Sequence, residues 1–80
     1  MINLTLYGTS GCHLCDEAQV LLNTIKNQFL FTLEMVDIAD DESLVKTYGI
    51  KIPVLIHSNK SELSWPFNEN VLTAWLKSNS

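Results

Sequence analysis

The sequence predicts an α/β protein in which strands and helices follow one another in the order βαβαββα. Residues 2–7 alternate between apolar and polar side chains, as expected of a strand with one buried face. Between residues 14 and 29 the apolar residues recur instead at helical spacing. Residues 52–56 form an almost continuous apolar run, which is typical of a strand covered on both faces.

The first half of the chain contains the first three expected elements. After the strand at residues 2–7, a loop begins with Gly8, and Thr9 or Ser10 is expected to cap the helix that follows. The apolar stripe of this helix consists of Leu14, Ala18, Leu21, Leu22, Ile25 and Phe29, with Cys15 beside it. A second strand is expected at residues 31–38, where Phe31 and Leu33 begin an alternation that continues to Met35.

The second half contains the remaining four elements. Acidic residues at 40–42 open a short helix, and Gly49 is expected at its C′ position. The apolar run at 52–56 forms the third strand, and a polar turn at 58–61 leads into a fourth strand at 62–65. Asn68 is expected to cap the last helix. The apolar side of that helix consists of Val71, Leu72, Trp75 and Leu76.

Length and composition indicate one globular domain that spans residues 1–80. The chain is 46% hydrophobic and 18% charged, which excludes a disordered polypeptide. Residues 1–7 lack the basic segment of a signal peptide, and no run approaches the roughly 20 apolar residues that span a bilayer. We therefore expect a cytoplasmic monomer with no membrane partner. The net charge of −4 argues against nucleic acid as a partner.

The two cysteines, Cys12 and Cys15, are the strongest functional signal. They lie three positions apart at the start of the first predicted helix. The unpaired N–H groups and the positive dipole end of a helix N-terminus favour the thiolate, which is the reactive form of cysteine. A Cys-x-x-Cys motif near a βαβ pattern, in a chain without a secretory signal, therefore predicts a redox-active dithiol.

Metal binding is the main alternative for these cysteines. A zinc site normally requires four ligands, and only His13 and His57 remain as further soft donors. Copper-carrier domains also place a Cys-x-x-Cys motif at a helix start, but their order is βαββαβ and a methionine precedes the motif. We therefore expect no metal ligand at the redox site. The alternative is a copper or zinc carrier that uses the same cysteines.

Six short segments, spread along the chain, carry a family resemblance. They are residues 6–7, 11–18, 36–38, 48–50, 52–55 and 65–67. Together with the order of elements, they resemble the small, bacterial-type glutaredoxin-like proteins of the thioredoxin-fold superfamily. The resemblance implies a thioredoxin fold with a central four-stranded mixed sheet flanked by helices. It also implies that Pro53, before the third strand, has a cis peptide bond and faces the cysteines.

The resemblance implies a thiol–disulfide oxidoreductase that reduces protein or low-molecular-weight disulfides. Cys12, the first and more exposed thiol, would attack a disulfide sulfur, and Cys15 would resolve the mixed disulfide. The spacing suits these roles because residues i and i+3 of a helix are surface neighbours.

Four further residues are expected to contact the substrate: His13, Leu14, Ile52 and Pro53. Ile52, beside Pro53, would offer its backbone to an extended substrate segment. His13 either tunes the charge of the neighbouring thiol or is a solvated first-turn side chain. Leu14 would supply apolar contact surface. Asp37 and Lys51 are expected either to flank the site or to be structural surface charges.

The sequence departs from glutaredoxins and thioredoxins in three places, one of which is the absence of a basic residue just ahead of Cys12. The dipeptide His13-Leu14 replaces the Pro-Tyr and Gly-Pro of the common forms. The Gly-Gly-Asp that holds the γ-glutamyl end of glutathione is replaced at residues 64–69, where Trp65 and Phe67 either pack in the core or form a wall of the groove.

No tightly bound cofactor is expected. The electron donor is expected to be a reductase or glutathione, although the missing Gly-Gly argues against glutathione. A thioredoxin-fold binding module, which uses the groove to hold a protein partner, is the remaining alternative to an enzyme.

Overall fold

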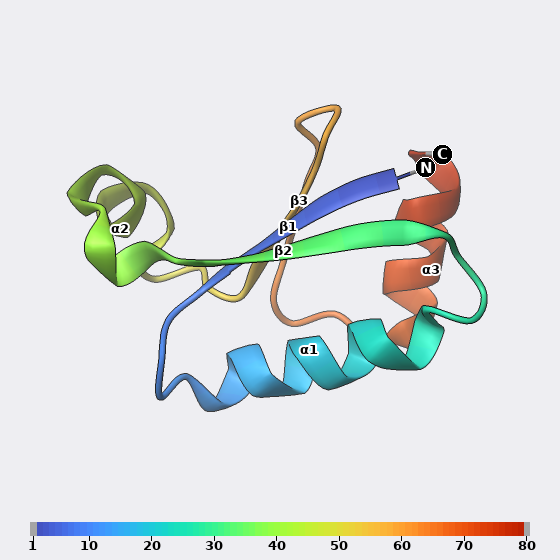
Figure 1. Ribbon diagram of the computed structural model, residues 1–80, viewed down its shortest axis with the longest axis horizontal. Coiled ribbons are helices and arrows are strands. Elements are labelled where there is room, and N and C mark those ends of the chain that lie inside the picture. The colour runs from blue at the N-terminus through green and yellow to red at the C-terminus, as the bar shows by residue number, and fades with distance from the viewer. Residues whose placement is uncertain (1, 80) are drawn as a thin grey trace.

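The computed structural model describes residues 2–79, which form a four-stranded mixed sheet with helices on both sides (Figure 1). Its elements are β1 (Ile2–Gly8), α1 (His13–Ile25), β2 (Phe31–Asp37), the 3₁₀ turn η1 (Ile38–Asp40), α2 (Glu42–Tyr48), β3 (Val54–His57), β4 (Glu62–Ser64) and α3 (Glu69–Ser78). Apart from the short turn η1, this is the predicted order βαβαββα.

The sheet has the strand order β2-β1-β3-β4. β1 is parallel to β2 and antiparallel to β3, and β3 is antiparallel to β4. The run predicted to be covered on both faces is thus an interior strand, in which Val54 and Leu55 are fully buried. The polar turn at 58–61 closes the predicted hairpin, and Lys60 adopts a left-handed conformation there (φ 75°).

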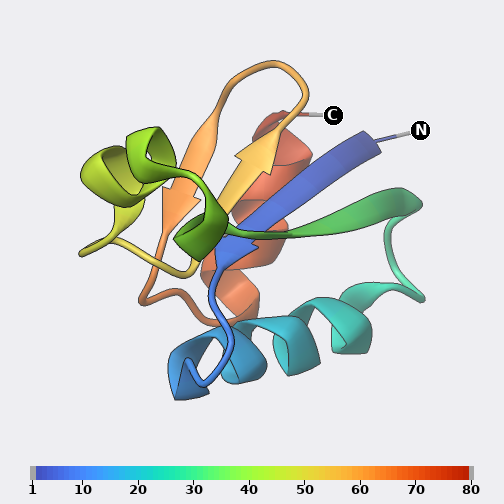
Figure 2. The ribbon, with the colours of Figure 1, turned by 60° about the vertical axis from the view of Figure 1, so that its left-hand side comes forward.

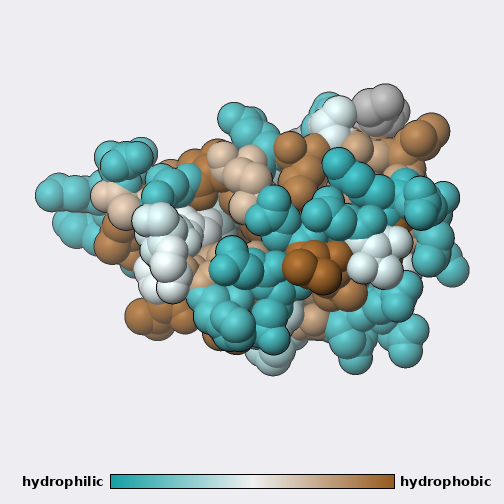
Figure 3. Space-filling model, turned by 60° about the horizontal axis from the view of Figure 1, so that its bottom comes forward, coloured by the Kyte–Doolittle hydropathy of each residue, from teal (hydrophilic) through white to brown (hydrophobic). Residues whose placement is uncertain are grey.

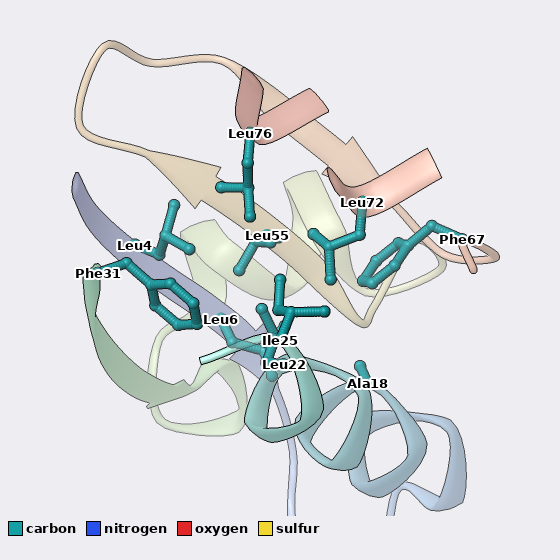
Figure 4. Close-up of a cluster of buried hydrophobic side chains, with 10 residues drawn as sticks. All are labelled: Leu4, Leu6, Ala18, Leu22, Ile25, Phe31, Leu55, Phe67, Leu72 and Leu76. Atoms are coloured by element: carbon teal, nitrogen blue, oxygen red, sulfur yellow. The ribbon is translucent and has the colours of Figure 1, made fainter. Parts of the chain in front are cut away.

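The helices divide unequally between the two faces of the sheet. α1 and α3 lie on one face, and α2 lies on the other face near one end (Figure 2). Buried side chains from the sheet, α1, α3 and the loop before α3 converge in one cluster (Figure 4). The cluster consists of Leu4, Leu6, Ala18, Leu22, Ile25, Phe31, Leu55, Phe67, Leu72 and Leu76. On the other face the ring of Tyr48 in α2 lies 4.9 Å from that of Tyr7 in β1.

The buried stripe of α1 differs from the predicted one by a shift at its start. It begins at Cys15 and continues through Ala18, Leu22 and Ile25, whereas Leu14 is 43% exposed. The prediction that Thr9 or Ser10 caps this helix is wrong, because Cys12 is the N-cap residue. The Cys12 N–H donates to the Thr9 carbonyl (3.3 Å), and the turn this closes delays the helix until His13.

Other element boundaries also differ from the sequence prediction: β1 extends to Gly8, α1 ends at Ile25 before Phe29, and β3 comprises Val54–His57 in place of residues 52–56. β2 ends at Asp37 because the Asp37 carboxylate accepts the Ala39 N–H (2.9 Å) and starts the turn η1. Gly49 is the C-cap of α2 in a right-handed conformation (φ −52°), not a left-handed C′ residue. β4 ends at Ser64. The capping role predicted for Asn68 is confirmed, since its Oδ1 accepts the Val71 N–H at 2.8 Å.

Among residues 2–79, no helix has both the length and the apolar character needed to cross a membrane.

Candidate active site

Cys12 and Cys15 are joined by a disulfide at the N-terminal end of α1. Their Cα atoms are 5.2 Å apart, within the range that disulfides require. The two residues differ in exposure, as the sequence predicted. Cys12 is half-buried, whereas Cys15 is only 5% exposed and lies on the inner side of the helix. Cys12 is therefore more open than Cys15 to a disulfide or thiol reagent in solution.

The position of Cys12 as the N-cap residue gives its sulfur a hydrogen-bond donor. The Cys15 N–H donates to the Cys12 Sγ at 3.2 Å. The first N–H groups of a helix have no partner within the helix and lie at its positive end. Because both effects favour negative charge on the accepting atom, the backbone stabilises a thiolate at Cys12 in the reduced protein.

Cys15 packs against the backbone of the strand that leads into the site. A β-carbon on Gly8 would lie 2.8 Å from the Cys15 Sγ, closer than real side chains approach. A small cleft of about 190 Å³ opens beside this contact. Its lining consists of Gly8, Thr9, Ser10, Cys15, Asp16, Met35, Val36 and Asp37. The end of β1, the end of β2 and the first turn of α1 therefore enclose the inner sulfur together.

Asp37 ties the end of β2 to the loop before the cysteines. The Ala39 N–H donates to its carboxylate at 2.9 Å, and the Thr9 hydroxyl and the Ser10 N–H lie close enough to favour its ionised form. These interactions, that from Ala39 first, lower the pKa of Asp37 below its ordinary value of 3.8. Thr9 and Ser10 belong to the turn that ends at Cys12, so Asp37 helps to position the loop that carries the outer sulfur.

The Ile52–Pro53 peptide bond is cis, and Pro53 is fully buried. Tyr7 in β1 pairs with Val54 in β3, and the same antiparallel register extended by one residue places Pro53 opposite Gly8. Pro53 thus lies beside the residue against which Cys15 packs. The backbone N–H of Ile52 donates to the Tyr48 carbonyl (3.0 Å), and this donor is therefore already used within the protein.

The remaining residues singled out from the sequence lie at the surface. His13 and Leu14 follow Cys12 in the first turn of α1 and are both exposed. Lys51 is exposed and lines neither the small cleft nor the larger groove described next.

A larger groove, of about 560 Å³, runs beside α1 and ends at His13. One wall comes from α1 and the other from the segment that enters α3, so we name it the α1–α3 groove. Its lining consists of His13, Asp16, Glu17, Val20, Leu21, Thr24, Trp65, Phe67, Asn68 and Glu69. Both alternatives for the two aromatic residues apply: Trp65 and Phe67 line this groove, and Phe67 also belongs to the core cluster, against which Trp65 packs. Their rings pack edge to face, with centroids 5.0 Å apart.

Two features of this groove differ from what the sequence pattern indicates. The Trp65–Pro66 bond is cis, like that at Pro53, whereas the sequence pattern indicates only the aromatic character of this segment. The α1 wall follows a second helical stripe with offsets of 3, 4, 7, 8 and 11 from His13. That stripe is visible in the sequence, but it contains mainly polar residues and therefore resembles an ordinary solvated helix face.

Of the two histidines considered as metal ligands, His13 directly follows Cys12, whereas His57 lies far from the cysteines. His57 is buried at the far end of β3, where it pairs with Leu4, four residues before Gly8 in β1. That separation is roughly 13 Å along a strand. Within the described part of the chain, no group of three or more His, Cys, Asp or Glu side chains is arranged to hold a metal ion.

Comparison with known proteins agrees with this geometry. The model of the glutaredoxin-like domain (DUF836) family matches residues 3–77, nearly the whole chain. The chain belongs to this family. It is similar to the X-ray structure of protein XcR50 from X. campestris, with 40% identity and a TM-score of 0.86 over 94% of this chain and 96% of that one.

Two further solved structures support the assignment of the fold. Protein Ne2328 from Nitrosomonas europaea is 33% identical, with a TM-score of 0.80 over 92% of this chain and 89% of that one. A mutant thioredoxin from Halobacterium salinarum is only 18% identical, but has a TM-score of 0.74 over 96% of this chain and 73% of that one. This glutaredoxin-like protein therefore has the predicted thioredoxin fold. No curated protein sequence matches the chain.

Proposed function

We propose that this glutaredoxin-like protein is a thiol–disulfide oxidoreductase that reduces the disulfides of other molecules with Cys12 and Cys15. The observation that supports the proposal most directly is the unequal exposure of two bonded sulfurs at a helix start. The outer sulfur is accessible and accepts a backbone N–H, and the inner one is buried within bonding reach of it. An attacking thiol and a resolving thiol need these two environments.

The first step begins with the reduced protein. The Cys12 thiolate attacks one sulfur of the substrate disulfide, and a mixed disulfide forms between Cys12 and the substrate. The substrate S–S bond breaks, and its second sulfur leaves as a thiolate that takes up a proton. The helix N-terminus favours this step because it increases the fraction of Cys12 present as thiolate.

The second step releases the substrate. Cys15 loses its proton and attacks the Cys12 sulfur, which breaks the mixed disulfide and frees the second substrate thiolate for protonation. The substrate has then gained two electrons and two protons, and the protein carries the Cys12–Cys15 disulfide. An external thiol, either the dithiol of a reductase or glutathione, returns the electrons.

The residues around the cysteines have supporting roles in this proposal. An extended substrate segment would lie alongside Ile52 and Pro53. Leu14, which is exposed beside the attacking sulfur, offers apolar contact surface. His13 lies next to Cys12 in the chain, and its positive form would further favour the thiolate.

The test is reduction of insulin disulfides by dithiothreitol in the presence of the protein. The wild-type protein should accelerate the reaction, and Cys12→Ser should abolish the acceleration. Cys15→Ser should instead accumulate a mixed disulfide, seen as an insulin-chain adduct by mass spectrometry. Full activity in Cys12→Ser would overturn the assigned roles, and no acceleration by the wild type would overturn the function. Tight binding of copper(I) or zinc by a dithiol that does not form the disulfide would favour a metal carrier.

A further inference from the structure

We propose that the α1–α3 groove binds a polypeptide segment that combines lysine or arginine with apolar side chains, next to the disulfide to be reduced. The reduction of that disulfide rests on the proposed function, but binding of the segment does not. The groove would thus select basic, partly apolar regions of protein substrates and disfavour glutathione.

Apolar side chains from both walls line the groove. Trp65 is half-buried and packs on Phe67, which is only 5% exposed, and Val20 and Leu21 belong to the α1 wall. Val20 is 65% exposed, although it lies in the middle of α1. The face of the molecule that comes forward when the side of α1 in Figure 1 is turned to the viewer is mostly hydrophilic, with separate hydrophobic residues on it (Figure 3). An apolar lining framed by polar residues is the usual character of a recognition site. A volume of about 560 Å³ is sufficient to hold several side chains.

The rim of the groove carries only one sign of fixed charge. Asp16, Glu17 and Glu69 are three of the nine acidic residues of the chain. None of its five basic residues appears among the described residues that line the groove. Asp16 and Glu69 also suit the first turns of their helices, but Glu17 has no such explanation. An apolar cleft lined by one sign of charge attracts ligands of the opposite charge.

The length of the groove favours a polypeptide over a tripeptide. His13 and Thr24 mark the two ends of the α1 wall, and eleven residues of helix span roughly 16 Å. About five residues of extended chain cover that distance, whereas a tripeptide covers about 10 Å. Glutathione is also the wrong ligand electrostatically, because it has two carboxylates and one ammonium group.

One end of the groove lies next to the attacking residue in the chain. His13 lines the groove and directly follows Cys12, the N-cap residue of α1, so in this proposal a segment bound along α1 ends near the outer sulfur. A disulfide just beyond the bound segment would be attacked by Cys12 and released by Cys15, with the electron balance given above. The groove therefore determines which disulfides are presented, and the dithiol reduces them.

Two synthetic peptides test this inference. Both contain the same apolar residues and the same intramolecular disulfide, and they differ only in flanking residues, which are lysine in one and glutamate in the other. At low salt, with dithiothreitol as the electron donor, the wild-type protein should reduce the lysine peptide with a kcat/KM at least about tenfold higher than that for the glutamate peptide. The preference should shrink with added salt, since the rim charges are exposed to solvent.

A matched pair of variants locates the effect. Glu17→Lys with Glu69→Lys reverses the rim and should abolish or invert the preference. Glu34→Lys with Glu42→Lys changes the net charge by the same amount outside the groove. Glu42 matches Glu69 because each lies in the first turn of its helix. This control should retain the preference. Equal rates for the two peptides in the wild type, or equal losses in both double variants, would overturn the inference.

A binding measurement keeps this result separate from the proposed function. A variant with Cys12→Ser and Cys15→Ser cannot react, and a lysine peptide without cysteine serves as the probe. Titration with the lysine peptide should shift the NMR signals of Val20, Leu21 and Glu69. Titration with the glutamate peptide should leave these signals unchanged. If these signals do not move, the groove proposal is wrong even if insulin is reduced. If they move but no peptide is reduced, the groove proposal stands and the oxidoreductase proposal fails.

Discussion

The Cys15 sulfur lies against the backbone of Gly8, at a place where a β-carbon would come within 2.8 Å of it. In the disulfide form this sulfur cannot move aside, because its bond to Cys12 fixes its direction. In the dithiol form the side chain of Cys15 is free to rotate. The absence of a side chain at residue 8 is therefore a requirement of the oxidised state more than of the reduced state.

Gly8→Ala should shift the equilibrium of the protein toward the dithiol. Forcing a methyl group into a packed site costs roughly 1–3 kcal/mol, which corresponds to about a 5–150-fold change in an equilibrium constant. The measurement is the fraction of disulfide in buffers of defined ratios of oxidised to reduced dithiothreitol. In a Cys15→Ala background, Gly8→Ala should destabilise the fold less than in the oxidised wild type. An unchanged equilibrium in Gly8→Ala would show that the contact with the sulfur carries no energy.

Asp37 should stabilise the site only while its carboxylate is ionised. Its pKa is lowered in the folded protein, chiefly by the Ala39 N–H, so ionisation is easier in the folded state than in the unfolded one. The resulting stability is present above the ordinary value of 3.8 and is lost as the pH falls through the lower folded value. Urea denaturation between pH 7 and pH 2 should therefore show that the free energy of unfolding falls less for Asp37→Asn than for the wild type. Equal losses of unfolding free energy in the two proteins would contradict this.

Tyr48 should make the protein sensitive to alkali. Burial, followed by the charge of Glu62, raises the pKa of Tyr48 above its ordinary value of 10.0. Stability is fully present below pH 10 and falls as the pH rises toward the folded value, because only the unfolded state ionises readily in that range. Tyr48→Phe should lose less stability between pH 9 and pH 11 than the wild type. Tyr7→Phe is a useful comparison, since Tyr7 packs against the same ring.

Local patterns in the sequence were sufficient for most of the fold. The alternation at residues 2–7, the cap at Asn68 and the motif at Cys12 each depend on neighbours a few residues away, and all three are found where they were predicted. The buried stripe of α1 starts at Cys15 and not at the predicted Leu14. Both residues are apolar, so the pattern alone did not show which one faces inward. Thr9 and Ser10 are also stronger capping residues than cysteine.

The α1–α3 groove could not be predicted because it depends on contacts between distant segments. Its two walls, at His13–Thr24 and at Trp65–Glu69, are some forty residues apart in the sequence. Only the packing of α3 beside α1 brings them together. The contact between Gly8 and Cys15 is of the same kind, since a glycine before a loop has an adequate local explanation and nothing in the pattern shows which side chain packs on it.

Two adjacent residues of α3 should differ sharply in their contribution to stability. Leu72 is fully buried in the core cluster, whereas Val71 is 44% exposed. Leu72→Ala should lower the free energy of unfolding by about 2–5 kcal/mol, a large part of what an 80-residue protein has. Val71→Ala should change it by no more than about 0.5 kcal/mol. Urea denaturation of the two variants makes the comparison, and equal losses would show that α3 does not pack on α1 and the sheet as described. Since α3 also carries one wall of the groove, Leu72→Ala should weaken binding of the lysine peptide even where Cys12 and Cys15 still form their disulfide.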